Sequence, residues 1–390
     1  MTQAPAQPLA AVLGVAREVM RGPVPTTGPL DAGPGVLAGL VASLGDDVAG
    51  TERLVAGWLH RYQREVRHSG LIDGGLAGMA AGASAAVPAW PRMAGLAAHA
   101  RKRLVSNSPT AQPPERIQWN HYDVLHGAAG LALALVVSPD CRPDQVLPAA
   151  TWLAGLCDTD DLSRARVTGH PGDPLRDWNT GRVNLGVGHG VAGIAAALLA
   201  SLVVTGPRQD LARALDRIVR FLQRESYVDD RGIRTWPPAG RRDDPPPTGA
   251  SGRQAWCYGT PGVAWVLWEA GRVLAAPDVQ RFAADAMESL CRCWDDELHV
   301  DPGPAQDSLA FCHGLAGVLL VAGAFDRHAG LPGASGLRAH VRGLLLARLD
   351  EVRGLAGHDL SHLTGASGVL SALLTDIGGE RSWLPTFALR

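Results

Sequence analysis

Hydrophobic and polar positions along the chain define two kinds of helix-length segment. Segments of the first kind carry almost no charge and are represented by residues 131–137, 194–204, 263–268 and 318–324. Segments of the second kind are amphipathic, and in residues 210–224 the apolar positions are Leu211, Leu215, Ile218 and Leu222. Apolar residues spaced by three and four positions are typical of α-helices rather than strands. The pattern predicts an all-α protein that combines fully buried helices with half-exposed ones.

The uncharged segments follow a repeated turn with the pattern Gly-x-x-Gly. Six copies occur about 50 to 70 residues apart, and self-similarity at such a period indicates a repeat architecture. Their first glycines are Gly75, Gly127, Gly190, Gly259, Gly314 and Gly365. A seventh, weaker copy between Gly35 and Gly39 has the wrong internal spacing. We therefore expect each unit to pair one buried helix with one amphipathic helix.

Two arrangements of such units fit the pattern. In a closed double ring, apolar helices form the inner layer, and their glycine-rich starts meet around a centre with free N–H groups. An open solenoid of helical hairpins is the alternative and would lack a central cavity. We interpret residues 1–390 as a single domain whose first 20 residues or so are flexible. The proline-rich stretches 106–115 and 229–252 are predicted loops, the second on the active face because it directly precedes Cys257.

Composition excludes several classes of function. The formal net charge of −2 gives no electrostatic reason to expect nucleic acid or an anionic membrane as a partner. The longest uncharged apolar stretch, 190–206, is short and rich in Gly and Ala, so we expect no transmembrane segment. The 6 cysteines are few and unevenly spaced, and no signal peptide precedes them. This usage favours reduced thiols in a cytoplasmic protein.

Unusual polar residues stand at or just before the first glycine in four of the turns: His126, His189, Cys257-Tyr258 and Cys312-His313. In a closed ring, equivalent positions of different repeats converge. Cys257, Cys312 and His313 would then supply three soft ligands and leave a fourth position open, which is typical of a zinc site. The remaining cysteines are interpreted as small apolar fillers: Cys141, Cys157, Cys291 and Cys293.

Several of these segments resemble motifs of one known family. Residues 253–259 (Arg-Gln-Ala-Trp-Cys-Tyr-Gly) and 311–317 (Phe-Cys-His-Gly-Leu-Ala-Gly) resemble the zinc signatures of the lanthipeptide cyclase family, also called lanthionine synthetase C or LanC-like. Residues 189–193 and 122–124 are similar to its two other active-site motifs, and residues 361–365 to its last repeat. The resemblance extends from about Gly74 to Arg390. It implies an α/α toroid with one Zn²⁺ at its centre.

The resemblance also implies an activity, that of a stand-alone lanthionine-forming cyclase. Such enzymes add a cysteine thiol of a dehydrated ribosomal precursor peptide to dehydroalanine or dehydrobutyrine, which closes a lanthionine or methyllanthionine thioether ring. A free thiol is mostly protonated at neutral pH, and coordination to Zn²⁺ deprotonates it. No dehydratase domain fits in this chain, so we expect a separate dehydratase as a partner, with an exporter as a further candidate.

Four residues receive catalytic roles under this interpretation. His189 is expected to protonate the α-carbon of the enolate, because the ordinary pKa of histidine lies close to neutral pH. Asp123 either orients His189 or acts as a base toward the thiol. Arg253 either stabilises the developing enolate oxygen or holds Asp123. Tyr258 either donates a hydrogen bond beside the zinc or packs as a core aromatic residue.

Alternatives remain open at this stage. His126 and His362 either line the cavity or are hydrogen-bonded core histidines. The same zinc chemistry could add glutathione to dehydroamino acids of damaged proteins. A third possibility is a non-catalytic, zinc-stabilised scaffold that binds a peptide, and a fourth protein ligand such as His189 or His126 would favour it.

Overall fold

The regular secondary structure of the computed structural model is almost entirely helical, which confirms the prediction of an all-α protein. It describes residues 6–46, 48–65, 68–138, 140–169, 178–241, 244–300 and 302–390. In these ranges the one sheet is a pair of short antiparallel strands, β1 (Tyr227–Val228) and β2 (Arg234–Thr235). No helix among the described residues is both long enough and apolar enough to cross a membrane.

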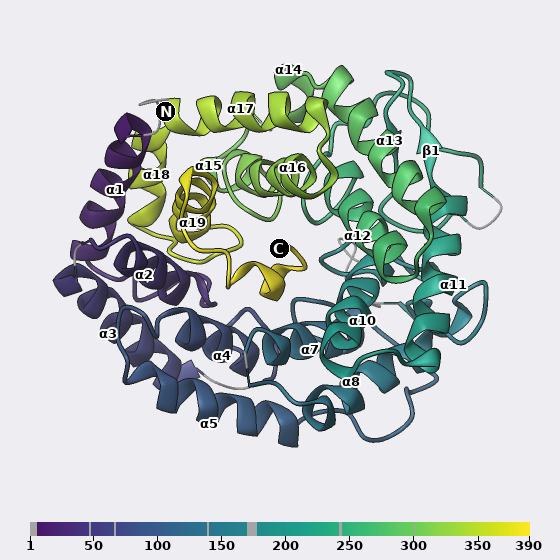
Figure 1. The fold of residues 1–390 in the computed structure, drawn as a ribbon, viewed down its shortest axis with the longest axis horizontal. Coiled ribbons are helices and arrows are strands. Elements are labelled where there is room, and N and C mark those ends of the chain that lie inside the picture. The colour runs from purple at the N-terminus through teal and green to yellow at the C-terminus, as the bar shows by residue number, and fades with distance from the viewer. Residues whose placement is uncertain are drawn as a thin grey trace.

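Apolar helices form an inner ring (Figure 1). Those in the described chain are α2 (Gly33–Ser43), α4 (Leu76–Ala85), α7 (Ala128–Val136), α10 (Val191–Thr205), α12 (Thr260–Val273), α16 (Leu315–Ala329) and α19 (Ala366–Ile377). Each helix contacts the next one along the chain, and α19 contacts α2. This last contact closes the ring, so the double ring is confirmed and the open solenoid was the wrong alternative.

Amphipathic helices form the outer layer, and each packs on an inner helix. They are α1 (Ala6–Arg21), α3 (Val48–Glu65), α5 (Met93–Ser106), α8 (Pro143–Leu156), α11 (Gln209–Glu225), α13 (Pro277–Cys293) and α17 (Pro332–Ala347). A further helix, α18 (Leu349–Ala356), packs between α1 and α19. In α11 the four apolar positions picked out by the sequence pattern are all fully buried. The period of three and four residues therefore identified the buried face correctly.

The N-terminal segment differs from our expectation. Residues 6–21 form helix α1, which packs on α3 and α19, and residues 1–5 lie outside the described residues. Val12, Val15 and Met20 have no exposed surface. Their apolar side chains recur at helical spacing, and burying them stabilises the helix against the ring.

The weak seventh copy of the repeat belongs to an inner helix. Gly35 and Gly39 both lie in α2, where a Cβ atom would fall on the backbone of Gly82 and Ala85 in the neighbouring α4. These two glycines therefore let α2 and α4 approach closely. Their role is different from that of the Gly-x-x-Gly turns, which explains the different spacing.

The second glycine of a Gly-x-x-Gly turn packs against the loop that precedes its own helix. A Cβ atom at Gly262 would fall on the carbonyl oxygen of Trp256, and one at Gly317 on that of Phe311. In both cases the oxygen belongs to the residue six positions earlier, so the loop folds back over the start of the helix. Only glycine leaves the space for this close approach.

Backbone hydrogen bonds join successive turns at the same end of the ring. The N–H of Val124 donates to Gly188 O (3.1 Å) and that of Val187 to Cys257 O (2.8 Å). The N–H of Cys257 donates to Cys312 O at 3.3 Å. The chain thus carries residues that are far apart in sequence to one face of the ring.

At the start of α2, which lacks a Gly-x-x-Gly turn, a buried carboxylate makes the contacts to the neighbouring loop. Asp31 accepts hydrogen bonds from the N–H groups of Gly33 (2.8 Å), His362 (2.7 Å) and Leu363 (3.2 Å). Burial raises its pKa to about 7, against the opposing effect of these N–H donors. Asp31 therefore links the beginning of α2 to the loop before α19.

Short helical elements lie in the connections between the long helices and near the C-terminus. They are α6 (Trp119–Tyr122), η1 (Ser163–Ala165), α14 (Asp296–His299), α15 (Ala305–Ser308) and η2 (Leu384–Phe387). Of the predicted loop 106–115, residues 107–115 contain no helix or strand and Ser106 ends α5, whereas the predicted loop 229–252 contains strand β2. Residues 242 and 243 of that loop lie outside the described residues.

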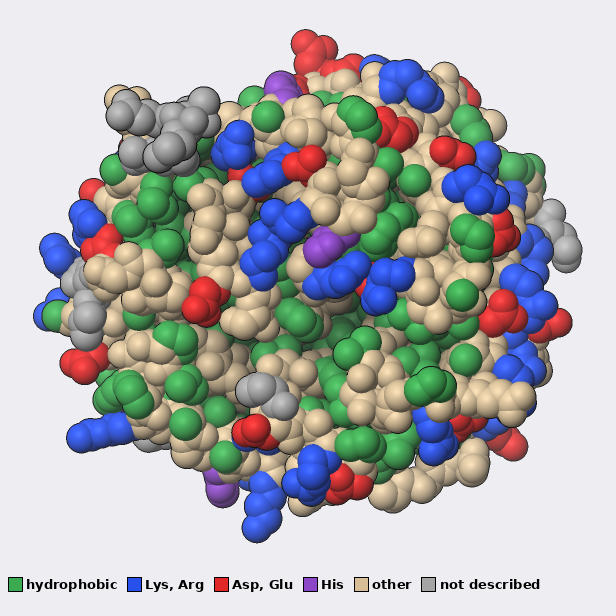
Figure 2. Space-filling view, viewed as in Figure 1, with side chains coloured by type: hydrophobic (Ala, Val, Ile, Leu, Met, Phe, Trp, Pro, Cys, Tyr) green, Lys and Arg blue, Asp and Glu red, His purple; other side chains and the backbone are tan. Residues whose placement is uncertain are grey.

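The final residues, 384–390, enter the centre of the ring (Figure 1). The indole N–H of Trp256 donates to Phe387 O at 2.9 Å, and that of Trp265 donates to Ala388 O at 3.1 Å. Arg390 forms an ion pair with Glu269 of α12. In the same view, basic side chains gather around the centre of the ring's surface (Figure 2).

Candidate functional site

Two thiols and one imidazole meet at the starts of α12 and α16. The ligand atoms of Cys257, Cys312 and His313 all lie within 4.8 Å of one another. Both cysteine residues are buried, with 2% and 5% of their surface exposed, whereas His313 is accessible to solvent. The structure therefore brings together the three residues that the sequence predicted as metal ligands. No fourth His, Cys, Asp or Glu joins the cluster in the described part of the chain.

The chemistry of these donors fits a zinc ion. Both cysteines are free thiols. A hydrogen bond with Cys257, together with burial, raises the pKa of Cys312 well above its usual value. Two adjacent buried thiols cannot both ionise unless a cation compensates their charge. Zn²⁺ prefers thiolate and imidazole ligands, and three of them would leave one position open.

A carboxylate and an imidazole form a close pair beside this cluster. Asp123 Oδ2 lies 2.6 Å from His189 Nδ1. The other oxygen, Oδ1, accepts hydrogen bonds from the N–H groups of His126 (2.7 Å) and Gly127 (2.9 Å). Burial acts to raise the pKa of Asp123, but the side chains of His126 and His189 outweigh it and hold that pKa below the usual value. The pair is therefore built around a buried, ionised carboxylate.

The ring of His189 is fixed on a second side by an aromatic contact. Trp119 stacks on it with ring centroids 4.8 Å apart and an interplanar angle of 23°. Because Asp123 occupies Nδ1, the other ring nitrogen, Nε2, is the one available to a substrate. The turn that carries His189 lies against Cys257, since the N–H of Val187 donates to Cys257 O. The imidazole and the metal cluster therefore share one face of the ring.

Tyr258 lies next to the candidate metal ligands and is largely enclosed. Asn184 Nδ2 donates to its hydroxyl oxygen at 2.8 Å, and Asn184 Oδ1 accepts from the N–H of Gly186. A Cβ atom at Gly186 would touch the phenol ring, so the ring packs on the backbone. Burial raises the pKa of Tyr258 well above its usual value. The residue is therefore a neutral phenol that packs and also keeps an O–H donor.

Arg253 occupies a different position from Asp123. It lines a cavity of about 450 Å³ that His313 also lines, and the walls include Leu298, Pro302 and Asp307. In the described part of the chain, the Asp123 carboxylate contacts His126, Gly127 and His189. Among the described residues, Arg253 therefore does not hold Asp123, and that alternative was wrong.

The two histidines without assigned roles have different surroundings. His126 Nε2 lies 3.2 Å from Asp73 Oδ2, and its Nδ1 lies 3.9 Å from Asp123 Oδ2. His362 is fully buried, its ring stacks on Phe387 at 4.2 Å, and neither ring nitrogen has a hydrogen-bond partner among the described residues. Burial lowers the pKa of His362 to about 3. It is thus a core histidine, although not a hydrogen-bonded one.

Sequence reasoning missed three residues that shape this site: Asp73, Trp119 and Asn184. Each acts through a predicted residue, by pairing with His126, stacking on His189 or binding Tyr258. None stands at the conspicuous position before a repeat glycine. The available signals were weak, namely the Gly74-Gly75 pair after Asp73 and the place of Asn184 six residues before Gly190.

A closed double ring of helices, with two thiols and an imidazole at the starts of two inner helices, defines an α/α toroid with a candidate zinc centre. The profile of the family described as "Lanthionine synthetase C-like protein" matches residues 53–389. The chain belongs to this family. Among solved structures it is similar to one described as nisin cyclase, with a TM-score of 0.70, 16% sequence identity and coverage of 97% of each chain. A search of curated proteins gave no match.

Proposed function

We propose that this protein is a zinc-dependent cyclase that forms lanthionine or methyllanthionine rings in a dehydrated peptide. The observation that carries the proposal is the shared location of two groups. The Cys257, Cys312 and His313 cluster lies on the same face as the Asp123–His189 pair, and adjoining turns connect them. Membership of the LanC-like family and the similarity to nisin cyclase support this activity.

Cys257, Cys312 and His313 would hold the ion and leave one position for a substrate thiol. Zn²⁺, when bound there, would lower the pKa of that thiol and present it as a thiolate at neutral pH. The sulfur adds to the β-carbon of dehydroalanine or dehydrobutyrine, and the double-bond electrons move toward the α-carbon and its carbonyl oxygen. One S–H is thus added across one C=C, so substrate and product have the same mass.

His189 is the proposed proton donor to the α-carbon. Its Nδ1 is held by Asp123, so the proton leaves from Nε2. Asp123 is the orienting group rather than a base toward the thiol, because it is fully buried and both of its oxygens have partners. A buried carboxylate in this position also stabilises the protonated imidazole before transfer.

Arg253 and Tyr258 are assigned to the developing negative charge. The Arg253 guanidinium lines the cavity beside His313 and would face the enolate oxygen of a peptide bound there. Tyr258 would donate its O–H near the metal ligands, while Asn184 holds its oxygen. Both groups would interact more strongly with the transition state than with the neutral substrate.

The remaining parts of the proposal concern partners and location. The cavity of about 450 Å³ beside His313 has a mixed polar and apolar lining and suits one segment of a peptide. The precursor would be dehydrated by a separate dehydratase and passed on to an exporter. A cytoplasmic location, where thiols stay reduced, belongs to the same proposal.

The direct experiment combines metal analysis with a thiol assay. The purified protein should contain one zinc per chain. It should convert a dehydrated, cysteine-containing peptide to a product of unchanged mass that no longer reacts with a thiol-alkylating reagent. Cys257→Ala and Cys312→Ala should lose both the zinc and the activity, whereas Cys141→Ala, distant from the cluster in the sequence and only partly buried, should keep both.

Two results would contradict the proposal. Zinc-loaded protein that consumes no peptide thiol but joins free glutathione to the dehydrated residues would assign it to the alternative chemistry. Unchanged product formation by His189→Ala and Asp123→Asn in cells that contain the dehydratase would favour the non-catalytic scaffold.

A further inference from the structure

The Asp123 carboxylate lies between two histidines. The His189 Nδ1 is 2.6 Å from Asp123 Oδ2, and the His126 Nδ1 is 3.9 Å from the same oxygen. The second distance is too long for a hydrogen bond but short enough for a strong attraction between opposite charges in a buried setting. His126 is also tied to Asp123 through its backbone, because its N–H donates to Oδ1 at 2.7 Å.

A second carboxylate holds the far side of His126. Asp73 Oδ2 lies 3.2 Å from His126 Nε2, and 61% of the Asp73 side chain is exposed. Asp73 has a φ of 54°, a left-handed conformation that is uncommon outside glycine, and its carbonyl oxygen is 3.1 Å from His68 Nε2. Four side chains therefore form a continuous series from the surface to the site: Asp73, His126, Asp123 and His189.

The buried carboxylate needs a cation at every stage of the reaction. Before proton transfer, a protonated His189 can balance the charge of Asp123. After His189 has given its proton to the substrate, Asp123 would be a buried anion without a cationic partner, which is costly. A second cation beside Asp123 removes this cost and makes the transfer easier.

We propose that His126, held by Asp73, is a positioning residue that keeps the Asp123 carboxylate compensated while His189 releases its proton. This role rests on the cyclase function proposed above. Among the described residues, His126 contacts Asp123, Asp73 and the ring of His68, so we infer that it acts through Asp123.

The electrostatic surroundings agree with a cationic His126. The charged and titratable groups that face it are Asp123, Asp73 and His68, whose ring centroid is 5.9 Å away, with His189 beyond Asp123. Asp123 and Asp73 raise the pKa of His126 to about 9. At neutral pH the residue therefore carries a proton, and above about pH 9 it loses it.

The activity test measures kcat and KM of zinc-loaded protein from pH 6 to 10 on the dehydrated peptide. Wild-type kcat should fall as the pH rises through about 9. His126→Gln should lower kcat about tenfold at neutral pH, leave KM unchanged and lack the decline near pH 9. His126→Lys should restore part of the rate because it returns a cation. His340→Gln removes a comparable exposed His–Asp pair and should behave as wild type.

A second measurement does not depend on activity. NMR titration of the His126 ring without substrate should give a midpoint that falls in both Asp73→Asn and Asp123→Asn. The inference is overturned if His126→Gln has the wild-type pH profile. It is also overturned if the titration midpoint of His126 is unchanged in Asp123→Asn. Wild-type protein that binds zinc but never cyclises the peptide would instead refute the proposed function. The NMR titration would still test the interaction between His126 and Asp123.

Discussion

The pKa values of His126 and His362 are shifted in opposite directions, although both residues stand in turns at the same end of the ring. Asp123 and Asp73 raise the pKa of His126 to about 9, whereas burial lowers the pKa of His362 to about 3. The ordinary value for histidine is about 6.5. The folded protein therefore favours the charged form of His126 and the neutral form of His362.

This difference predicts how stability depends on pH. Between about 6.5 and 9, His126 binds a proton in the folded state but not in the unfolded one, so its contribution is lost as pH rises. Below about 6.5 the unfolded chain protonates His362 and the folded protein does not, so stability falls as pH decreases. Thermal unfolding from pH 4 to 10 should show the alkaline loss reduced in His126→Gln and the acidic loss reduced in His362→Leu. Parallel curves for wild type and both variants would contradict the assignment.

At the same scale, the repeat explains which site residues the sequence could reveal. Cys257 and Cys312 stand two residues before the first glycine of their turns and His189 stands one residue before its own, so a closed ring brings all three to the same end. Asp73 and Trp119 have no such mark, because their roles depend on side-chain directions that spacing does not specify. For the same reason the sequence left two roles open for Arg253, and only the occupied oxygens of Asp123 excluded one of them.

At the scale of the elements, glycine has two different effects within helices. Gly317 near the start of α16 lies against the carbonyl oxygen of Phe311, whereas Gly343 within α17 has no neighbour within 4 Å of a Cβ position. The first position needs the absent side chain. The second only adds conformational freedom to the unfolded chain.

Alanine substitution should separate these effects. Gly317→Ala should destabilise the protein by about 1–3 kcal/mol, because the loop before α16 has to move away. Gly343→Ala should stabilise it by about 0.5–1 kcal/mol through better helix propensity. Urea unfolding of both variants provides the measurement, and equal effects of the two would refute the close-packed turn.

The contact that closes the ring depends on a carboxylate. Asp31 accepts from three backbone N–H groups between α2 and the loop before α19. In Asp31→Asn the amide NH₂ would face one of these donors, and leaving a buried N–H unpaired should cost about 1–3 kcal/mol. Asp210→Asn alters an exposed pair with Arg208 and should have little effect on the urea midpoint. Equal stability of Asp31→Asn and wild type would show that the ring does not need this closure.

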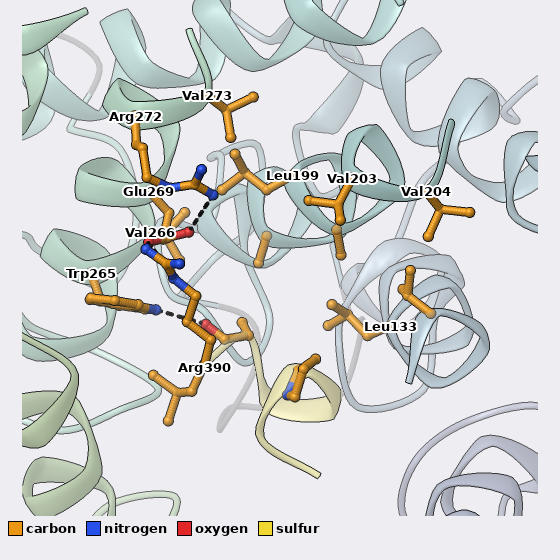
Figure 3. Close-up of a pocket in the computed structure, with 16 residues that line it drawn as sticks. Leu133, Leu199, Val203, Val204, Trp265, Val266, Glu269, Arg272, Val273 and Arg390 are labelled. Carbon is orange, nitrogen blue, oxygen red and sulfur yellow. Dashed lines mark hydrogen bonds and ion pairs between the residues drawn. The ribbon is translucent and has the colours of Figure 1, made fainter. Parts of the chain in front are cut away.

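At the scale of the whole molecule, residues 384–390 fill the middle of the ring. Phe387 is 2% exposed and packs among Trp256, Phe311, His362 and Trp383. The last residues also form one side of a cavity of about 430 Å³ with α7, α10 and α12 (Figure 3). Glu269 pairs there with both Arg272 and Arg390. The segment thus connects helices from distant parts of the chain.

Removal of the central aromatic ring should therefore weaken the entire fold. Phe387→Ala should cost about 3–5 kcal/mol in the free energy of unfolding, as expected for a buried phenylalanine. Val203→Ala, in the same cavity wall but 73% exposed, should change the stability by less than about 0.5 kcal/mol. Calorimetry of the two variants gives the comparison. A small effect of Phe387→Ala would mean that the ring is stable without its central segment.

The sequence by itself determined the helical class, the alternation of buried and half-exposed helices and the candidate metal ligands. These features depend on local periodicity and on repeat position, and both can be read directly from the sequence. Only the tertiary structure decided that α1 is packed, that α2 completes the inner ring, that Asp31 closes the ring and that His126 shares Asp123 with His189. Each of these depends on contacts between residues remote in sequence, and no local pattern specifies which remote side chain or N–H group fills a given place.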